Sequence, residues 1–213
     1  MLPNVVFSHG LSNSGNFSRE RYNLSTSAVK RDIQSLIRGI AHKLITKQEA
    51  NTQIKDCLDC YSSTLLESSI NNIGDYPVYG AIGLSGYIDN YKTSGESILV
   101  IKDGASVGNI QFVTGKYSVI GTLNYLKAKP LFSLRYLYYC LAGFNFAPYK
   151  TGMAIPHIYF KDYGNAQIYC PTYSIQEYIA DILKALDNKR SIEKNIAKIF
   201  LEQKNYLLRN LFI

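Results

Sequence analysis

The last forty or so residues carry the clearest hydrophobic pattern in the chain. From Ser174 to Phe212 there is no glycine or proline, and apolar side chains recur at alternating spacings of four and three, which is the heptad spacing of a coiled coil. This seam consists of Tyr178, Ile182, Ala185, Ile192, Ile196, Ile199 and Tyr206, with Lys189 and Gln203 as polar interruptions at the positions between. The S-x-x-E capping box that opens at Ser174 marks the start of the helix. At 1.5 Å per residue it would be about 60 Å long, too long for a compact domain to bury, so we expect it to need a partner helix.

A second helical pattern lies near the N-terminus. Apolar residues from Val29 to Ile45 recur at helical spacing, and this helix or a second copy of the chain is available as the partner. The T-x-x-E box that opens at Thr46 predicts another short helix running into the Ile54–Cys60 region. Residues 1–27 lack periodicity and are rich in Ser and Asn, which indicates an irregular arm.

The middle of the chain has a different texture. Residues 61–173 alternate short apolar or aromatic runs with glycines and turn residues, which is typical of strands joined by tight turns. We expect strands at Tyr76–Gly80, Gly86–Ile88, Ser97–Lys102, Gln111–Val113 and Ser118–Leu126. A helix should follow over Leu131–Leu141 and end near Gly143, and a last strand should include Ile168–Cys170.

These patterns together predict an α+β fold. One mixed α/β domain should carry a long, coiled-coil-forming C-terminal helix and an N-terminal helical segment. The expected boundaries are 1–52 for the arm and N-terminal helix, 53–173 for the mixed domain, and 174–213 for a spacer or dimerisation helix.

Three glycines in the first half of that domain suggest nucleotide binding at first sight. Gly80, Gly83 and Gly86 give G-x-x-G-x-x-G, one residue away from the dinucleotide fingerprint G-x-G-x-x-G. That fingerprint requires a helix after the glycines, whereas YIDNY follows here and is a poor helix former. We therefore interpret these glycines as turns in a sheet.

Composition adds a charge argument. Hydrophobic residues make up 46% of the chain and charged residues 18%, which favours a folded protein. The net charge of +7 favours a polyanionic partner, but the excess is spread along the chain, so any anion site must be assembled by folding. There are 18 tyrosines and no tryptophan. Tyrosine suits a half-wet binding surface and equally the rim of a β-rich core, and both readings stay open.

The cysteines do not form a metal-binding pattern. Cys57 and Cys60 make one C-x-x-C, without the second pair or the histidine partners that zinc sites use, so we expect no metal and reduced thiols. The N-terminus lacks a secretory signal pattern, and the most apolar run, Tyr136–Tyr149, is too short to span a bilayer. These features favour a cytoplasmic protein.

Four segments in order carry a family resemblance. Over residues 53–213 the chain resembles the specificity (S) subunits of type I restriction-modification enzymes in YPVYGAIGLSGYIDNY, ILVIKDGASVGN, TGMAIPHIY and CPTYSIQEYIADILKALDNK. Tyr76–Gly86 and Ile101–Gly108 match the recognition core. The family's A-x-P motif and the start of its spacer helix are matched by Ala154, Pro156, His157, Gln176, Ala180, Leu183 and Leu186.

The resemblance implies a DNA reader. In that family a target-recognition domain reads a few base pairs, and long helices act as spacers and as docking sites for methyltransferase (M) subunits. Standard S subunits hold two recognition domains, whereas this chain shows one, and about fifty N-terminal residues do not match. The resemblance therefore implies a half-length S subunit that pairs as a homodimer on a bipartite site in double-stranded DNA, and directs M subunits and, through them, restriction (R) subunits there.

Recognition of this kind requires no catalysis by the chain itself. The resemblance implies no catalytic residue and no cofactor, since S-adenosylmethionine would be bound by the M subunit. Cations neutralise phosphates and polar side chains reach base edges. Our phosphate candidates are Lys92, Lys102, Lys116, Lys150 and Lys161, and our candidates for bases or sugars are Tyr79, Asn90, Tyr149, Thr151 and His157. Any one of them can instead be an ordinary surface residue, although the set carries more weight than its members, and His157 can equally be a core histidine bonded to a backbone carbonyl.

Two other functions remain open. One is an interaction module that competes for M subunits without reading DNA. The other is an enzyme with an unrecognised small-molecule site in the tyrosine-rich domain, although none of the three histidines lies in a catalytic motif.

Overall fold

The computed structural model describes residues 35–37, 39–46, 48–70 and 73–211, and its chain divides into two compact units. One unit is Arg38–Lys184. The other is Met1–Ile37 together with Ala185–Ile213. The arm predicted for residues 1–27, and the part of the Val29–Ile45 helix before Ser35, lie outside the described residues. From Ser35 to Ala41 the described residues are α-helical, and η1 (His42–Thr46) continues them as a π-helix.

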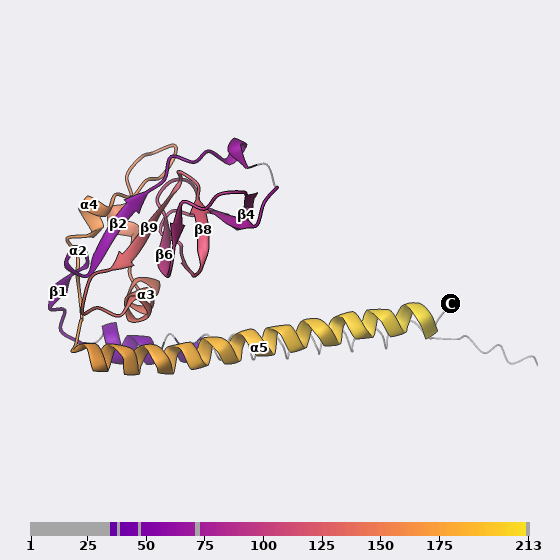
Figure 1. Ribbon diagram of the computed structural model, residues 1–213. Coiled ribbons are helices and arrows are strands. Elements are labelled where there is room, and N and C mark those ends of the chain that lie inside the picture. Colours follow the sequence, from indigo (N-terminus) through magenta and orange to yellow (C-terminus); the bar gives the residue numbers. More distant parts are fainter. Residues whose placement is uncertain (1–34, 38, 47, 71–72, 212–213) are drawn as a thin grey trace, which may run out of the picture. The chain divides into compact units, whose positions relative to one another are not determined.

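Two four-stranded sheets form the centre of the Arg38–Lys184 unit (Figure 1). The first is antiparallel and has the order β2 (Leu58–Ser62), β9 (Leu123–Ala128), β6 (Ser97–Ile101) and β7 (Ile110–Val113). The second has the order β4 (Gly83–Ile88), β3 (Tyr76–Gly80), β8 (Lys116–Val119) and β5 (Thr93–Ser94), with β3 and β8 parallel. Each sheet also pairs strands that are distant in sequence, such as β2 with β9 and β3 with β8, and local sequence pattern cannot predict these pairings.

The core lies where these sheets meet. Every residue of β6 is buried, and Leu99 and Ile101 pack in one cluster with Val78 of β3 and Val119 of β8. The β-branched and aliphatic run SILVI therefore forms a central strand covered on both faces. Its placement between β9 and β7 fixes the turn that follows it, Lys102–Asn109, at one end of the sheet.

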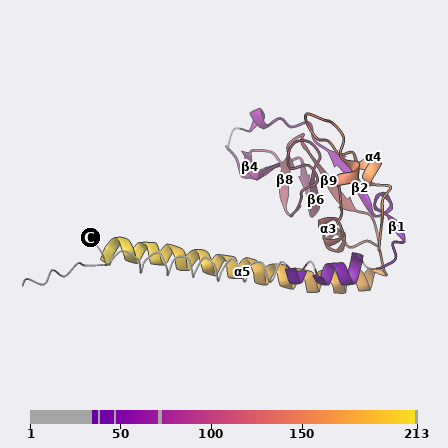
Figure 2. The same cartoon turned by 180° about the vertical axis from the view of Figure 1, so that it is seen from behind.

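Helix α3 (Leu134–Ala142) covers one face of the first sheet. Ser133 is its N-cap, with a side-chain oxygen that accepts from Tyr136 N. Tyr138 meets Phe112 of β7 edge to face, and the Arg135 guanidinium lies 4.1 Å from the Phe112 ring centroid. Figure 2 shows from behind that α3 lies between the sheet and the first turns of the long helix α5 (Tyr173–Leu211).

Short elements close the domain near the base of α5. Strand β1 (Thr52–Gln53) pairs with β10 (Gln167–Ile168), and Asn51 bonds the Cys170 backbone through both ends of its amide. The remaining short elements are α2 (Ile54–Cys57), η2 (Glu67–Ser69), η3 (Ala147–Tyr149) and α4 (Phe160–Tyr163). The chain thus enters and leaves the domain at neighbouring points.

Gln176 joins α5 to the domain. Its side chain is buried, its Nε2 donates to Pro171 O at 2.8 Å, and its Oε1 accepts from Ser133 N at 2.9 Å. Ile179, Ala180 and Leu183 are buried beside it. One amide therefore connects the first turn of α5 with the N-cap residue of α3.

The predicted fold class is confirmed: a mixed α/β domain carries a long C-terminal helix. The strands at Tyr76–Gly80 and Ser97–Lys102 are confirmed to within one residue, and α3 lies within one residue of the predicted end. No helix follows Gly80, Gly83 and Gly86, because β3 and β4 form an antiparallel pair.

Two local predictions are wrong. The helix expected to open at Thr46 and run into Ile54–Cys60 does not form: residues 48–51 are not helical, Thr52–Gln53 is strand β1, only Ile54–Cys57 is helical, and Leu58–Ser62 pairs with β9 along its whole length. The single strand expected at Ser118–Leu126 is two strands in different sheets. Gly121 N donates to Leu65 O at 2.8 Å at the corner between them. In both cases tertiary pairing overrides local pattern.

The four cysteines are free thiols. Cys57 Sγ and Cys170 Sγ lie 3.6 Å apart, and their hydrogen bond, together with burial, raises the pKa of Cys57. Burial raises the pKa of Cys60 to about 11. Among the described residues there is no group of three or more potential metal ligands, and no helix there is long and apolar enough to cross a membrane.

Candidate nucleic-acid interface

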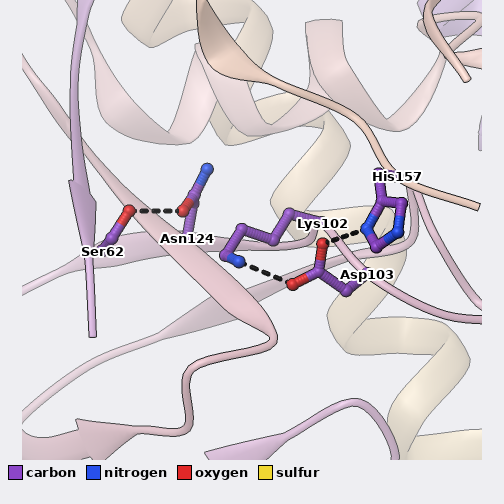
Figure 3. A network of polar contacts seen from close by, with 5 residues as sticks. All are labelled: Ser62, Lys102, Asp103, Asn124 and His157. Carbon is purple, nitrogen blue, oxygen red and sulfur yellow. Dashed lines mark hydrogen bonds and ion pairs between the residues drawn. The ribbon is translucent and has the colours of Figure 1, made fainter. Parts of the chain in front are cut away.

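The turn after β6 holds the best-defined polar cluster of the domain (Figure 3). Lys102 Nζ lies 2.6 Å from Asp103 Oδ2, and His157 Nδ1 lies 2.7 Å from Asp103 Oδ1, which accepts the hydrogen bond. The carboxylate thus bridges two residues that we predicted to contact DNA. Asp103 itself was not predicted, and its partner His157 is 54 positions away in sequence.

Backbone bonds lock the loop of His157 onto this turn. Thr151 N donates to His157 O at 2.9 Å and His157 N donates to Thr151 O at 2.7 Å. Gly104 N donates to Pro156 O at 3.0 Å. Gly152 has a φ of +86°, and a Cβ there would collide with the carbonyl oxygen of Ile155, so only glycine fits this turn. The structure therefore brings Lys102, Thr151 and His157 together.

Asp103 is held as a carboxylate by its partners. Partial burial on its own would raise the pKa, but hydrogen bonds from His157 and Lys102, and their positive charge, bring the pKa of Asp103 below its usual value. The Asp103 carboxylate is consequently ionised at neutral pH and pairs with the Lys102 ammonium. Such a bridge fixes the loop, and it also engages the Lys102 ammonium.

Tyr149 and Lys150 begin the same loop. The Tyr149 ring stacks on Phe144, with centroids 5.7 Å apart, and Phe144 packs edge to face on Phe146. Lys150 is exposed. Stacked aromatic side chains thus precede an exposed cation next to the Thr151–His157 pair. This arrangement suits contact with a nucleic-acid backbone.

A second group of candidates lies around β5 and the start of β8. Asn90 and Lys92 are exposed, and Lys92 N donates to Ser118 Oγ at 3.1 Å. Lys116 Nζ lies 5.0 Å from the ring centroid of Tyr91. The structure therefore gathers three predicted residues, together with Tyr91, at this end of the second sheet.

Lys92 also lines a pocket of about 500 Å³ whose wall is rich in hydroxyl groups. These hydroxyls belong to Ser62, Ser63, Thr64, Ser69 and Thr93. Sequence reasoning missed this set. The run YSSTLLESS is visibly rich in hydroxyl residues, but only the folded chain brings it against Lys92.

Two candidates belong to neither group. Tyr79 is half-buried against the core and meets Tyr117 edge to face. Lys161 lies on α4, with its Nζ 5.4 Å from the Tyr159 ring centroid. The roles proposed for these residues remain predictions.

The predicted helix seam is largely exposed. Ile192 is 58% exposed, Ile199 61% and Tyr206 67%, and Ile196 and Tyr178 are exposed too. Ile182 is half-buried and Ala185 exposed. From Ala185 on, the described helix thus presents isoleucine, leucine and tyrosine side chains to solvent.

Comparison with known proteins gives a family match. Residues 33–199 match the family described as the type I restriction modification DNA specificity domain. A putative type I restriction enzyme specificity subunit of Haemophilus influenzae is 32% identical over 124 residues, covering 57% of this chain and 32% of that protein. The EcoprrI specificity subunit of Escherichia coli is 23% identical over 124 residues, covering 58% of this chain and 31% of that protein. The matched part thus spans about a third of each relative.

Solved structures share the fold. The type I restriction-modification S subunit of M. genitalium superposes with a TM-score of 0.69 at 17% identity, covering 89% of this chain and 56% of that one. The HsdS subunit of Thermoanaerobacter tengcongensis superposes with a TM-score of 0.58 at 16% identity, covering 85% and 49%. At these identities the likeness concerns the fold alone.

Proposed function

Because the chain belongs to the family of type I restriction-modification DNA specificity domains, we propose that it recognises a DNA sequence and holds partner subunits at that site. The observation that carries this proposal is the extent of the match. Residues 33–199 include the whole mixed α/β domain and most of α5, the two parts that such a function requires.

Recognition is assigned to the domain. Lys150 and Lys116, each beside an aromatic ring or stack, and the exposed Lys92 and Lys161 neutralise phosphates. Lys102 and His157 contribute through the Asp103 bridge, which holds the Thr151–His157 loop in one shape. Exposed polar side chains such as Asn90 and Thr151 then reach base or sugar edges from fixed positions.

Assembly is assigned to α5. A second copy pairs along the seam of Ile192, Ile196 and Ile199, and a pair with twofold symmetry reads two identical half-sites in opposite orientation. The pair directs M subunits and, through them, R subunits to this bipartite site. The chain supplies no catalytic group, and S-adenosylmethionine is bound by the M subunit.

Methylation mapping in cells tests this function. Genomic methylated bases are mapped with and without the gene, and then with the gene restored. Loss of one two-part motif, regained on restoration, is the expected result. An unchanged methylation pattern would contradict sequence recognition.

The exposed helix face also supports a second candidate, a chain that competes for M subunits without reading DNA. Overexpression separates the two. A competitor reduces methylation at the motif of an intact S subunit and adds no new motif, whereas a reader adds one.

A further inference from the structure

A pocket of about 390 Å³ opens between the two sheets at the β3–β4 hairpin. Its floor is apolar and consists of Leu99, Ile101 and Leu123. The hairpin turn Gly80–Gly83 forms one wall, and Asn109 and Gln111 form the other. None of the residues predicted from sequence to contact DNA lines this pocket.

Two side-chain amides face this pocket without partners. Gln111 is opposite Leu99 in the β6–β7 pair, and its neighbour Phe112 packs on α3, so strand alternation puts Gln111 on the side of the sheet that faces the pocket. Asn109 is exposed and directly precedes the same strand. Among the described residues neither amide has a hydrogen-bond partner. A half-buried glutamine beside an apolar core thus keeps its donors and acceptor free for a ligand.

The opposite wall offers an apolar contact. Ile82, at the tip of the hairpin, is 90% exposed. Gly83 beside it has a φ of +103°, a conformation that glycine adopts readily and that makes the tight turn possible. Ile82 is therefore an exposed aliphatic side chain at the tip of a β-hairpin, where it can contact an apolar group of a ligand.

The pocket adjoins the Asp103 cluster. Ile101 lines the pocket and is followed directly by Lys102. Ile101 N donates to Asn109 O and Gly108 N donates to Ile101 O, both at 2.9 Å, so the two sites share one backbone turn. The Lys102–Asp103–His157 cluster therefore adjoins the strand end that carries the free amides.

The major groove of DNA admits a two-stranded β-ribbon such as the β3–β4 hairpin. The base edges exposed in that groove offer the groups that the walls of this pocket can bind. Adenine offers N6 and N7 to a bidentate glutamine or asparagine, and thymine offers a C5-methyl group to an apolar side chain. We propose that Gln111, supported by Asn109, reads adenine and that Ile82 contacts the thymine methyl of the same A·T pair. These residues would then determine sequence specificity. The inference rests on the proposed function.

The test is selection of bound duplexes from a random library by the full-length chain at low salt. Wild type should enrich a motif in which one position of each half-site is restricted to A·T. Gln111→Ala should lose the preference at that position, with affinity for the selected site falling about 5- to 150-fold, since a good bidentate contact is worth ~1–3 kcal/mol. Gln111→Arg should shift that position toward G·C, because arginine reads guanine.

Thr114→Ala is the matched control, because Thr114 is exposed close to β7 and does not line the pocket. It should keep the wild-type motif and affinity. If Gln111→Ala keeps the motif while affinity for all sequences falls equally, the reading role is wrong and the proposed function stands. If wild type enriches no motif, the proposed function itself fails.

Ile82 gives a readout that does not depend on the fold of the Gln111 variants. Replacing the contacted thymine by deoxyuridine removes only the methyl group. Wild type should bind the deoxyuridine duplex a few-fold more weakly, and Ile82→Ala should bind both duplexes equally. Equal binding of both by wild type would overturn the assignment of Ile82.

Discussion

The recognition domain and the C-terminal part of α5 treat their apolar side chains in opposite ways. In the domain, Ser97–Ile101 of β6 is buried over its whole length. In the helix from Ala185 on, Ile192, Ile199 and Tyr206 are each more than half exposed. Full burial of such a side chain stabilises a fold by about 1.5–3 kcal/mol. The domain obtains this stabilisation by burying its apolar side chains within its own core. The helix obtains it only when a partner covers the seam.

The difference separates the two tasks that we propose. A self-sufficient domain presents fixed loops to DNA. The helix exposes an apolar surface that a second copy or an M subunit can cover. Variants of the helix should therefore change assembly and leave the domain intact, and variants of the domain should do the reverse.

The largest expected effect is loss of self-association when the apolar seam of the helix is disrupted. Ile192→Asp combined with Ile196→Asp buries two charges in any paired seam and should abolish self-association at micromolar concentration, measured by light scattering. The thermal unfolding of the domain should stay as in wild type.

Ser191→Asp combined with Asn205→Asp is the control, since both positions are exposed, lie off the seam and receive the same added charge. This control should still associate. An intact dimer of the Ile192/Ile196 variant would refute the seam.

The next effect concerns Gln176, which holds the first turn of α5 to the domain. Gln176→Ala leaves Ser133 N and Pro171 O without their partner in a buried place and should lower the free energy of unfolding by about 2–4 kcal/mol. Urea unfolding followed by circular dichroism measures it. Lys184→Ala, exposed on the same helix, should cost less than about 0.5 kcal/mol. A similarly small cost for Gln176→Ala would show that the joint is not held by this amide.

A smaller effect belongs to the charged bridge within the domain. The pKa of Asp103 is lowered in the folded state, so its contribution is present above the unfolded pKa and is lost as the pH falls through the folded pKa. Asp103→Asn should cost about 1 kcal/mol at pH 6–7, and the difference from wild type should shrink on acidification below about pH 4. Urea unfolding across this range checks the sign. A difference that grows toward low pH would contradict the bridge.

The smallest effect compares the DNA binding of a lysine that is paired with a carboxylate and of one that is exposed. Lys150→Ala should weaken DNA binding evenly across sequences and reduce the slope of log affinity against log salt by about one. Lys102→Ala should change that slope less, because the Lys102 ammonium already pairs with Asp103. Fluorescence anisotropy over a salt series measures both slopes, and the opposite order would contradict this reading of the two lysines.

The sequence pattern predicted the elements whose conformation depends mainly on neighbouring residues. The run at Ser97–Lys102 is β-branched and aliphatic, and the long segment without glycine or proline after Ser174 is helical, as expected. Strand β2 was missed because its pairing with β9 joins residues more than sixty positions apart. At the base of α5 the buried face is Gln176, Ile179, Ala180 and Leu183, because the first turns pack on the domain, whereas Tyr178 of the heptad seam is already exposed there.

The candidate site divides in the same way. Thr151 and His157 were predicted within one segment, and the structure pairs them. Asp103 was overlooked since nothing near it in sequence indicates its partner His157. Gln111 and Ile82 carry no motif, and only the packing of the two sheets brings them to one pocket.

Selection from a random duplex library with two proteins tests the central claim most directly. Wild type should enrich two copies of one half-site in opposite orientation at a fixed spacing, and the Ile192→Asp/Ile196→Asp variant should enrich the single half-site. That outcome would mean that the domain reads and the helix spaces. Enrichment of no sequence by either protein would contradict the account.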